Sequence, residues 1–450
     1  MKKLIFAAMV CIAYISNAQT LSYNDIGVLF SKEEINGTAR YNAMSGAFGA
    51  LGGDLSSIGI NPAGAAVFMN SEFSVSLGIR NSTTDATYYG NTSSTENDKT
   101  NLSQAGGVFV FDSGKYSDIN KIAIAFNYSR VNDFENFWNV KGNNGSAAPI
   151  TDIYDSEVMY DLIDGQYFEN FTDGRNDKYS FTIATQRNED LYLGFTLNTY
   201  DIEHYQTTLL EEYNSDSDSN TFDISQTQEL LTYGEGVSFG LGLISKPADN
   251  MRLGLAYQSP VWYNISEESI EYDVNIFEND INITNEYNAN DTYSGINGFD
   301  YKLRTPSKLT GSFAYIFDKQ GLISIDYTYK NYSNIELKNA NFTSENQAFQ
   351  QDLESTGELR IGTEWRFDKV SLRGGYHFEK SPYKNAKDSD NLEGYSLGAG
   401  FKFRGGKLDF AYQKETNTAP YNFNPADYNL NSTELDFNNS KITATLVLSL

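Results

Sequence analysis

Apolar and polar residues alternate at every second position over most of the chain after residue 71. In the segment 73–79, for example, Phe73, Val75, Leu77 and Ile79 are separated by serine and glycine. The same period appears at 122–128, 237–243, 359–367, 395–403 and 442–450. Because successive side chains of a β-strand point to opposite faces, each segment is predicted to be a strand with one apolar face. Such strands occur in soluble antiparallel sheets and in transmembrane barrels.

The lengths of the connections distinguish these two folds. Six short links lie near 112–120, 187–190, 246–250, 318–320, 368–369 and 405–406. Between them are seven long segments rich in Asn, Asp and Ser, at about 82–102, 131–177, 201–235, 264–298, 331–355, 379–393 and 416–440. Strict alternation of short turns and long loops predicts about 14 strands with every long loop at one end. The predicted fold is therefore all-β, a transmembrane antiparallel β-barrel over residues 71–450.

The short link at 368–369 also predicts a register for the hairpin around it. A two-residue turn at this place sets Glu364 opposite Arg373 and Arg360 opposite His377, all on the polar face. Polar residues then face polar residues, and a slip of one residue would mix the two faces.

A second hairpin is predicted around the Gly405-Gly406 pair. Taking these two glycines as the turn sets Lys402 opposite Asp409 and Phe403 opposite Leu408. Here too, the predicted register keeps polar residues together on one face and apolar residues together on the other.

The first 18 residues have the pattern of a secretory signal peptide. Lys2 and Lys3 precede an apolar stretch at 4–15, and the small residues of 16–18 form a cleavage site before residue 19. About 12 apolar residues are too few to span a bilayer. The one cysteine, Cys11, lies within this segment, so the mature chain is expected to be exported and to fold without disulfides.

Residues 19–70 do not alternate and are rich in small side chains, especially from Gly37 to Asp54. A closed sheet of about 14 strands has a diameter near ~28 Å, which side chains from the wall cannot fill. The barrel is therefore either an open porin or plugged. Since charges are few between Thr38 and Met69, residues 19–70 are predicted to form a compact plug, or hatch, rather than a flexible arm.

The signal sequence, the small-residue plug, the Asn61-Pro62-Ala63 tripeptide before the first strand and the terminal apolar residue together resemble one family. The chain is similar to the FadL-type outer-membrane transporters of long-chain fatty acids and aromatic hydrocarbons, most specifically over residues 40–68. The resemblance implies a 14-stranded barrel closed by a hatch, with Asn61, Pro62 and Ala63 as the hatch motif. It also implies passive uptake with lateral exit at a kinked third strand, although no Pro or Gly lies between Lys121 and Arg130.

Composition narrows the function classes further. With 33 Lys+Arg against 59 Asp+Glu, the net charge of −26 disfavours a nucleic-acid partner. One cysteine and two histidines leave little basis for thiol chemistry, a zinc cage or a histidine-based triad, so we expect no enzyme, no metal site and no cofactor. The expected partners are a hydrophobic small molecule and outer-membrane lipid, bound by a monomer in the bacterial outer membrane.

Five cations fall on the predicted lumen face of the last strands: Arg360, Arg366, Arg373, Lys402 and Arg404. Arg360 or Arg373 is the candidate for binding the carboxylate head group of a ligand through a charge-assisted hydrogen bond. The alternative is cross-strand pairing, as between Glu364 and Arg373, which serves the wall alone.

The predicted function is passive uptake of hydrophobic compounds, with long-chain fatty acids as the preferred cargo and aromatic hydrocarbons or haem left open. Capture, hatch rearrangement and lateral exit are its expected steps. The alternative from another class is a structural or adhesive outer-membrane barrel with acidic extracellular loops, and a general hydrophilic porin is a third hypothesis.

Overall fold

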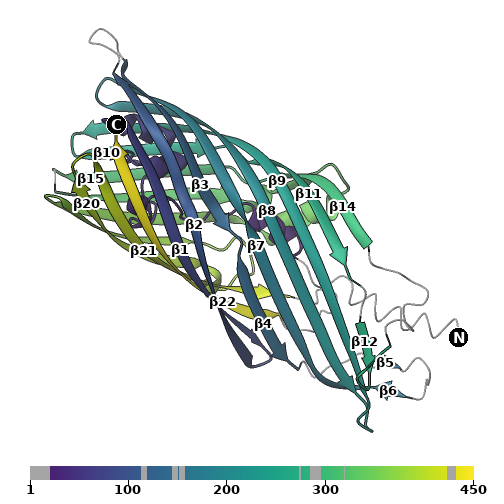
Figure 1. Ribbon diagram of the computed structural model, residues 1–450. Helices are drawn as coiled ribbons and strands as arrows, with labels where there is room; N and C mark the ends of the chain where they lie inside the picture. The colour runs from purple at the N-terminus through teal and green to yellow at the C-terminus, as the bar shows by residue number, and fades with distance from the viewer. Residues whose placement is uncertain are drawn as a thin grey trace.

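The computed structural model describes residues 21–112, 119–143, 150–151, 158–272, 275–283, 295–318, 320–422 and 432–450. The predicted signal peptide, residues 1–18, lies outside the described residues. The chain forms a long, obliquely sheared barrel with short helical elements of the N-terminal region inside it (Figure 1).

The described helical elements are α2 (Tyr23–Leu29), α3 (Ala39–Asn42), α5 (Thr343–Asp352) and the 3₁₀ turns η1 (Leu55–Gly59), η2 (Pro62–Val67), η3 (Tyr332–Asn334) and η4 (Asp388–Asp390). The described strands are β1 (Glu72–Tyr88), β2 (Asn91–Asp112), β3 (Ile119–Asp133), β4 (Asn136–Gly142), β5 (Ile150–Thr151), β6 (Met159–Tyr160), β7 (Leu162–Arg187), β8 (Leu191–Ser215), β9 (Thr221–Ala248), β10 (Met251–Gln258), β11 (Trp262–Glu271), β12 (Asn275–Glu278), β13 (Ile281–Asn282), β14 (Gly295–Arg304), β15 (Lys308–Phe317), β16 (Gly321–Asn331), β17 (Glu336–Lys338), β18 (Ser355–Phe367), β19 (Val370–Glu379), β20 (Leu392–Phe403), β21 (Gly406–Tyr421) and β22 (Thr433–Ser449).

These segments build a closed antiparallel barrel of 14 strands, as predicted. Some barrel strands consist of consecutive segments: β3 continues into β4, β10 into β11 and β12, and β14 into β15. The sheet closes because β1 pairs with β2 on one side and with β22 on the other. Closure of the sheet is the condition for crossing a bilayer with strands.

The apolar phase of the alternation faces outward. Leu77, Phe126 and Leu397 are 56%, 52% and 58% exposed, whereas Ser76 and Ser396 on the other phase are almost fully buried inside the barrel. A protein in water would bury the first set and expose the second. The observed arrangement matches a hydrocarbon environment around the barrel.

The hairpin β18–β19 has the predicted register. Glu364 lies opposite Arg373 and Arg360 lies opposite His377. Asp368, the first residue of the turn, has a φ of 52°, a left-handed conformation that aspartate tolerates better than most residues.

The predicted register of the β20–β21 hairpin is wrong by two residues. The turn is Arg404-Gly405, so Lys402 faces Lys407 and Phe403 faces Gly406. Gly405 has a φ of +85°, so it supplies the left-handed position of the turn, while Gly406 already belongs to β21. Because the shift is even, each residue stays on its predicted face.

Several of the predicted long loops are wrong as well. The segment 82–102 is the distal part of the β1–β2 hairpin, which turns at Tyr89-Gly90. In 131–177, 201–235, 264–298 and 416–440, most of the described residues belong to strands. The strands β8 and β9 contain 25 and 28 residues and pair as far as Ser215 with Thr221. A membrane crossing takes ~9–11 residues, so these strands continue well beyond the bilayer. A strand that continues into water carries polar side chains on both faces. Its composition is then that of a loop, which explains the wrong prediction.

Residues 21–70, hereafter the N-terminal segment, lie inside the barrel and end just before β1. Ala39, Ala43, Met44, Ala47 and Phe48 are completely buried. Close contact is possible because the wall facing them is lined by glycines of β18, β19 and β20, where a Cβ would meet Met44 or Ala43 within 2.4–2.9 Å.

Candidate functional site

The Asn61-Pro62-Ala63 tripeptide begins η2 and fastens it to the barrel wall. The Asn61 side chain accepts a hydrogen bond from the Ala63 amide at 3.1 Å. Its Nδ2 donates to the carbonyl of Gly49 at 2.7 Å and to that of Leu243 in β9 at 3.0 Å. Pro62 occupies the first position of the turn, where a missing N–H costs nothing. One amide side chain thus ties η2 to the rest of the N-terminal segment and to the wall.

Two wall glycines make room for this turn. A Cβ on Gly194 in β8 would lie 2.3 Å from the Ala63 nitrogen, and a Cβ on Gly242 in β9 would lie 2.0 Å from the Asn61 Oδ1. Such distances do not occur between real atoms, so only glycine permits this seating. Alanines of η2 pack on the other side against Ala123 and Ala125 of β3.

The third barrel strand is interrupted where the resemblance implied a kink. The register of β3 against β7 shifts between Arg130 and Asn132, and β3 gives way to β4 two residues after Asp133. Pairing between β2 and β3 ends at Gln104 with Ser129, although β2 itself runs back to residue 91. Within the described residues, the wall between β2 and β3–β4 therefore has no backbone ladder beyond this point. We call this stretch the β2–β3 seam.

Side chains bridge the β2–β3 seam instead. The Thr95 hydroxyl donates to the Phe137 carbonyl at 2.6 Å, and Asn101 donates to Asp133 at 2.8 Å. Lys99 forms an ion pair with Glu135. Side-chain bridges can part without breaking a backbone ladder, which makes the seam a weak line in the wall.

The N-terminal segment also holds the inner side of the seam. The Glu34 amide donates to the Val131 carbonyl at 2.8 Å, and the Asn36 side chain donates to the Arg130 carbonyl at 2.8 Å. The segment therefore contacts the wall at the place where its backbone pairing fails.

The two candidate head-group cations face the lumen, and both have acidic partners. Arg360 is 6% exposed, forms an ion pair with Glu358 and donates to the Tyr41 hydroxyl at 3.0 Å. Arg373 is 7% exposed and contacts Glu364 at 2.7 Å and Asp409 at 2.6 Å. These contacts are the pairing expected for wall residues, and the head-group role of the two arginines stays a prediction.

Acidic wall residues also bind the N-terminal segment. Arg40 contacts Glu364 at 2.7 Å, so this carboxylate holds both Arg40 and Arg373. The Asp326 carboxylate in β16 accepts a hydrogen bond from the Gly49 amide at 2.8 Å. Charged wall residues thus serve as fixed points for residues 39–50.

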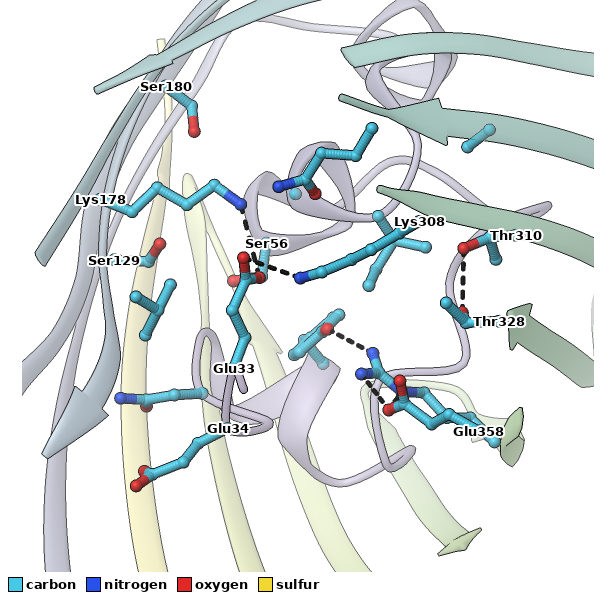
Figure 2. Close-up of a pocket in the computed structure, with 18 of the residues that line it drawn as sticks. Glu33, Glu34, Ser56, Ser129, Lys178, Ser180, Lys308, Thr310, Thr328 and Glu358 are labelled. Atoms are coloured by element: carbon cyan, nitrogen blue, oxygen red, sulfur yellow. Dashed lines mark hydrogen bonds and ion pairs between the residues drawn. The ribbon is translucent and has the colours of Figure 1, made fainter. Parts of the chain in front are cut away.

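A second set of charges, which the sequence did not single out, lies in the lumen next to a cavity of about 60 Å³. Glu33 of the N-terminal segment lies between two lysines from different parts of the wall (Figure 2). Its carboxylate is 2.8 Å from Lys308 Nζ in β15 and 3.6 Å from Lys178 Nζ in β7. Burial raises the pKa of Glu33, but the ammonium groups of Lys178 and Lys308, together with that of Lys330, lower it by more, so this carboxyl remains ionised.

A larger cavity of about 220 Å³ adjoins Glu33 on the other side. It is lined by Lys32, Glu34, His377, Glu415 and Lys441 together with the apolar side chains of Leu29, Ile35 and Leu392. Pockets that bind ligands usually measure ~300–1,000 Å³. The lumen is therefore closed around this segment in the conformation described.

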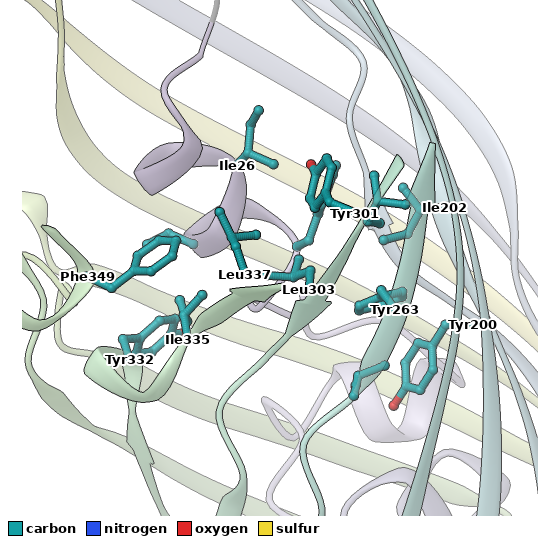
Figure 3. Close-up of a cluster of buried hydrophobic side chains, with 14 of the residues drawn as sticks. Ile26, Tyr200, Ile202, Tyr263, Tyr301, Leu303, Tyr332, Ile335, Leu337 and Phe349 are labelled. Carbon is teal, nitrogen blue, oxygen red and sulfur yellow. The ribbon is translucent and has the colours of Figure 1, made fainter. Parts of the chain in front are cut away.

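Above the charged layer, α2 fills an apolar chamber. Ile26, Val28 and Phe30 are buried among side chains from the barrel wall and from α5. Figure 3 shows Ile26 facing these side chains. The wall of this chamber comprises Tyr200, Ile202, Leu230, Val261, Tyr263, Ile265, Tyr301, Leu303, Tyr332, Ile335, Leu337, Phe342, Phe349 and Leu353, with Val131 and Phe134 at the seam. We call this the α2 chamber. Removing α2 would leave an apolar space bordered by tyrosines and reaching the β2–β3 seam.

The family follows from a comparison with known sequences. The profile of a family described as "Outer membrane protein transport protein (OMPP1/FadL/TodX)" matches residues 26–441. The chain belongs to this family. It is an outer-membrane transport protein of the FadL/TodX type rather than a member of an enzyme family, and its barrel lies in the bacterial outer membrane.

Solved structures agree on the fold. The chain is similar to a Pseudomonas aeruginosa FadL homologue, with a TM-score of 0.59 and 13% identity over 93% of this chain and 99% of that one. It is also similar to the CymD monoaromatic hydrocarbon channel (0.52, 13%, 93% and 99%) and to the P. putida toluene transporter TodX (0.51, 12%, 92% and 99%). No curated protein matches the sequence.

No helix within the described residues has the length and apolar character needed to cross a membrane. No group of three or more His, Cys, Asp or Glu side chains in the described ranges has the geometry to hold a metal ion.

Proposed function

We propose that this FadL/TodX protein takes up hydrophobic compounds passively across the outer membrane, with long-chain fatty acids as its preferred cargo. The observation that carries the proposal is the α2 chamber, an apolar space inside the barrel that a seven-residue helix of the N-terminal segment fills. A helix held mainly by apolar contacts can be replaced by an apolar ligand of similar volume, because the buried apolar area is conserved.

In this proposal the N-terminal segment acts as a hatch. Ligand enters the α2 chamber from the end of the barrel that carries the long strands, and α2 moves away. Since Glu34 and Asn36 hold the inner side of the β2–β3 seam, movement of this part of the hatch frees the seam. The ligand then leaves sideways through the seam into the membrane.

The preference for fatty acids over aromatic hydrocarbons is supported by the cations beneath the chamber. A carboxylate head group is bound best by buried cations that donate hydrogen bonds. Lys178 and Lys308 are such cations, and Lys178 Nζ lies 5.4 Å from the ring centroid of Tyr200 in the chamber wall. Toluene and other monoaromatics, the compounds named for two of the similar structures, have no group that these lysines would bind.

Uptake of labelled oleate by cells with and without the gene tests the proposal. We expect faster uptake with the gene, and slower uptake when the chamber is narrowed by Ile202→Trp. A panel of fatty acids, alkanes and monoaromatics that enters equally fast in both strains would remove the transport proposal.

The closed lumen is also what a structural or adhesive barrel would have. The two hypotheses differ in the purified protein, because a transporter binds an apolar ligand in the α2 chamber and a structural barrel does not. Equilibrium binding of a labelled fatty acid to the protein in lipid nanodiscs separates them.

A further inference from the structure

Glu33 provides the acidic group for two lysines that the wall leaves otherwise unpaired. In the part of the chain that the structure describes, neither Lys178 nor Lys308 has an ion pair with another carboxylate. Both are buried, with side chains 3% and 15% exposed. Burying two ammonium groups without a partner is strongly unfavourable, so an anion is favoured at this point.

The other cations around the same cavity are satisfied by the wall itself. Lys330 contacts Glu379 at 2.9 Å and Glu358 at 3.4 Å, and Arg360 pairs with Glu358. These two cations therefore have acidic partners in the wall, whereas Lys178 and Lys308 contact the Glu33 carboxylate of the N-terminal segment (Figure 2).

The anion site adjoins the α2 chamber. Lys178 Nζ lies 5.4 Å from the ring centroid of Tyr200, and Tyr200 packs edge-on against Tyr263 in the chamber wall. A ligand with a carboxylate between the lysines would therefore extend its apolar chain along these rings, as a fatty acid requires.

Glu33 is also the connection between this site and α2. The amides of Ser31 and Lys32 bond to the Val28 carbonyl at the end of α2, and Glu33 follows directly. Because so few residues separate them, the Glu33 ion pair holds the end of α2 at the base of the chamber.

We propose that Lys178 and Lys308 form the binding site for the carboxylate of an anionic amphiphile, and that Glu33 occupies this site as an internal substitute until the ligand displaces it. The proposal rests on the proposed function. Exchange of one carboxylate for another keeps both lysines paired throughout, so the step does not pass through two unpaired buried charges. The exchange also couples recognition of the head group to release of α2. The two lysines that bind the ligand are the ones that held Glu33, and with it the end of α2.

The test compares laurate with 1-dodecanol, which share a chain length and differ in charge, on the full protein in lipid nanodiscs. The readout is the ratio of the two affinities, because opening of the chamber alone changes both ligands alike. Glu33→Gln removes the competitor, and we expect the laurate-to-dodecanol ratio to rise about tenfold, the size of one charge-assisted hydrogen bond. Lys308→Met removes half of the site and should lower the ratio about tenfold.

Matched controls come from an exposed ion pair of the same kind, Lys387 with Glu434 at 3.0 Å. Glu434→Gln and Lys387→Met should leave the ratio at the wild-type value. Retention of the heat-modifiable gel shift shows that each variant has an intact barrel, and Glu33→Asp, which keeps the charge, should restore most of the wild-type ratio.

Hydrogen exchange over residues 22–34 gives a second readout. Laurate should speed exchange there in the wild type more than dodecanol does, and Glu33→Gln should speed it without ligand. A ratio that stays constant in Glu33→Gln and Lys308→Met, while the wild type binds both ligands, overturns this inference and leaves the proposed function standing. Failure of every variant to bind either ligand overturns both.

Discussion

The two halves of the N-terminal segment are held in the barrel by different means. Residues 39–68 are small, almost fully buried and pressed against wall glycines, with backbone and side-chain hydrogen bonds to β9, β16, β20 and β22. Residues 21–36 present large apolar side chains and charged contacts, namely the Glu33–Lys308 pair and a longer Glu34–Arg80 pair. The first arrangement depends on close backbone approach, which no ligand can imitate. The second depends on apolar area and a carboxylate, which a fatty acid can supply.

This difference indicates a division of labour along one segment. We expect the inner half, residues 39–68, to stay seated during transport while the front half, residues 21–36, exchanges with the ligand. The front half also contacts the β2–β3 seam, so its movement is enough to free the lateral path.

The largest effect is expected from filling the glycine cradle of the inner half. Gly242→Val places methyl groups where Asn61 Oδ1 lies 2.0 Å from the Cβ position, so η2 has to leave its seat. Overpacking of this kind lowers the stability of the packed arrangement by about 1–3 kcal/mol or more. We expect raised conductance in planar bilayers and faster hydrogen exchange over residues 55–68.

Gly311→Val is the matched control, because a Cβ at Gly311 in β15 meets nothing within 4 Å. Its conductance should equal that of the wild type. Equal conductance of the two valine variants would mean that the cradle does not seat the inner half.

Asn61→Ala should have the next largest effect. It removes the cap of η2 and two donated hydrogen bonds, a loss of about 1–3 kcal/mol from the seating of the inner half. Oleate uptake should fall more than barrel assembly, which the heat-modifiable gel shift reports. Asn61→Asp keeps the acceptor and loses the donors, so an effect as small as that of a neutral surface change would refute the tie to β9.

Tyr41→Phe should have a small effect. It removes the hydroxyl that accepts a hydrogen bond from Arg360, while the Arg360–Glu358 pair remains. We expect the free energy that seats the inner half in the barrel to fall by about 0.5–1.5 kcal/mol. Slightly faster hydrogen exchange over residues 39–47, with an unchanged laurate-to-dodecanol ratio, is the expected result. A changed ratio would instead support Arg360 as a head-group residue.

The smallest effect is expected from locking the inner half in place. The hydroxyls of Ser45 and Ser396 in β20 are 2.8 Å apart, so Ser45→Cys with Ser396→Cys brings two thiols near disulfide geometry. If the front half alone moves, oxidation should leave oleate uptake within about twofold of the reduced protein. Uptake that stops on oxidation and returns on reduction would show that the inner half moves too.

Several features of the fold follow from local sequence. The period-two alternation assigned each strand residue to lipid or lumen, since the two faces of a strand are fixed by its geometry. The short links gave the strand number, and the turn at 368–369 gave the register of Arg360 and Arg373. These properties depend on neighbours in sequence, and the structure agrees with them.

Other features depend on contacts between distant residues. The turn at 404–405 was missed because two adjacent glycines allow two registers that differ by two residues. Both registers leave every side chain on the same face, and the observed one pairs Gly406 with Leu448 of β22. The break in β3 has no Pro or Gly to mark it. It occurs where β2 stops pairing with β3 and side chains from the N-terminal segment take over part of the bonding.

The site itself was the least accessible to sequence reasoning. Arg360 and Arg373 were found by their phase, and the Glu364–Arg373 pair by the hairpin register. The contacts of Arg360 with Glu358 and of Arg373 with Asp409, and the role of Glu33, were not. Glu33 meets Lys178 and Lys308 only because a closed barrel brings strands β7 and β15 to face one lumen, and because an N-terminal segment lies inside it. The order of apolar and polar residues determines which way each side chain points, since that is a local property of a strand. Which charges meet in the lumen is decided by closure of the sheet, because closure alone sets the distance between residues far apart in the chain.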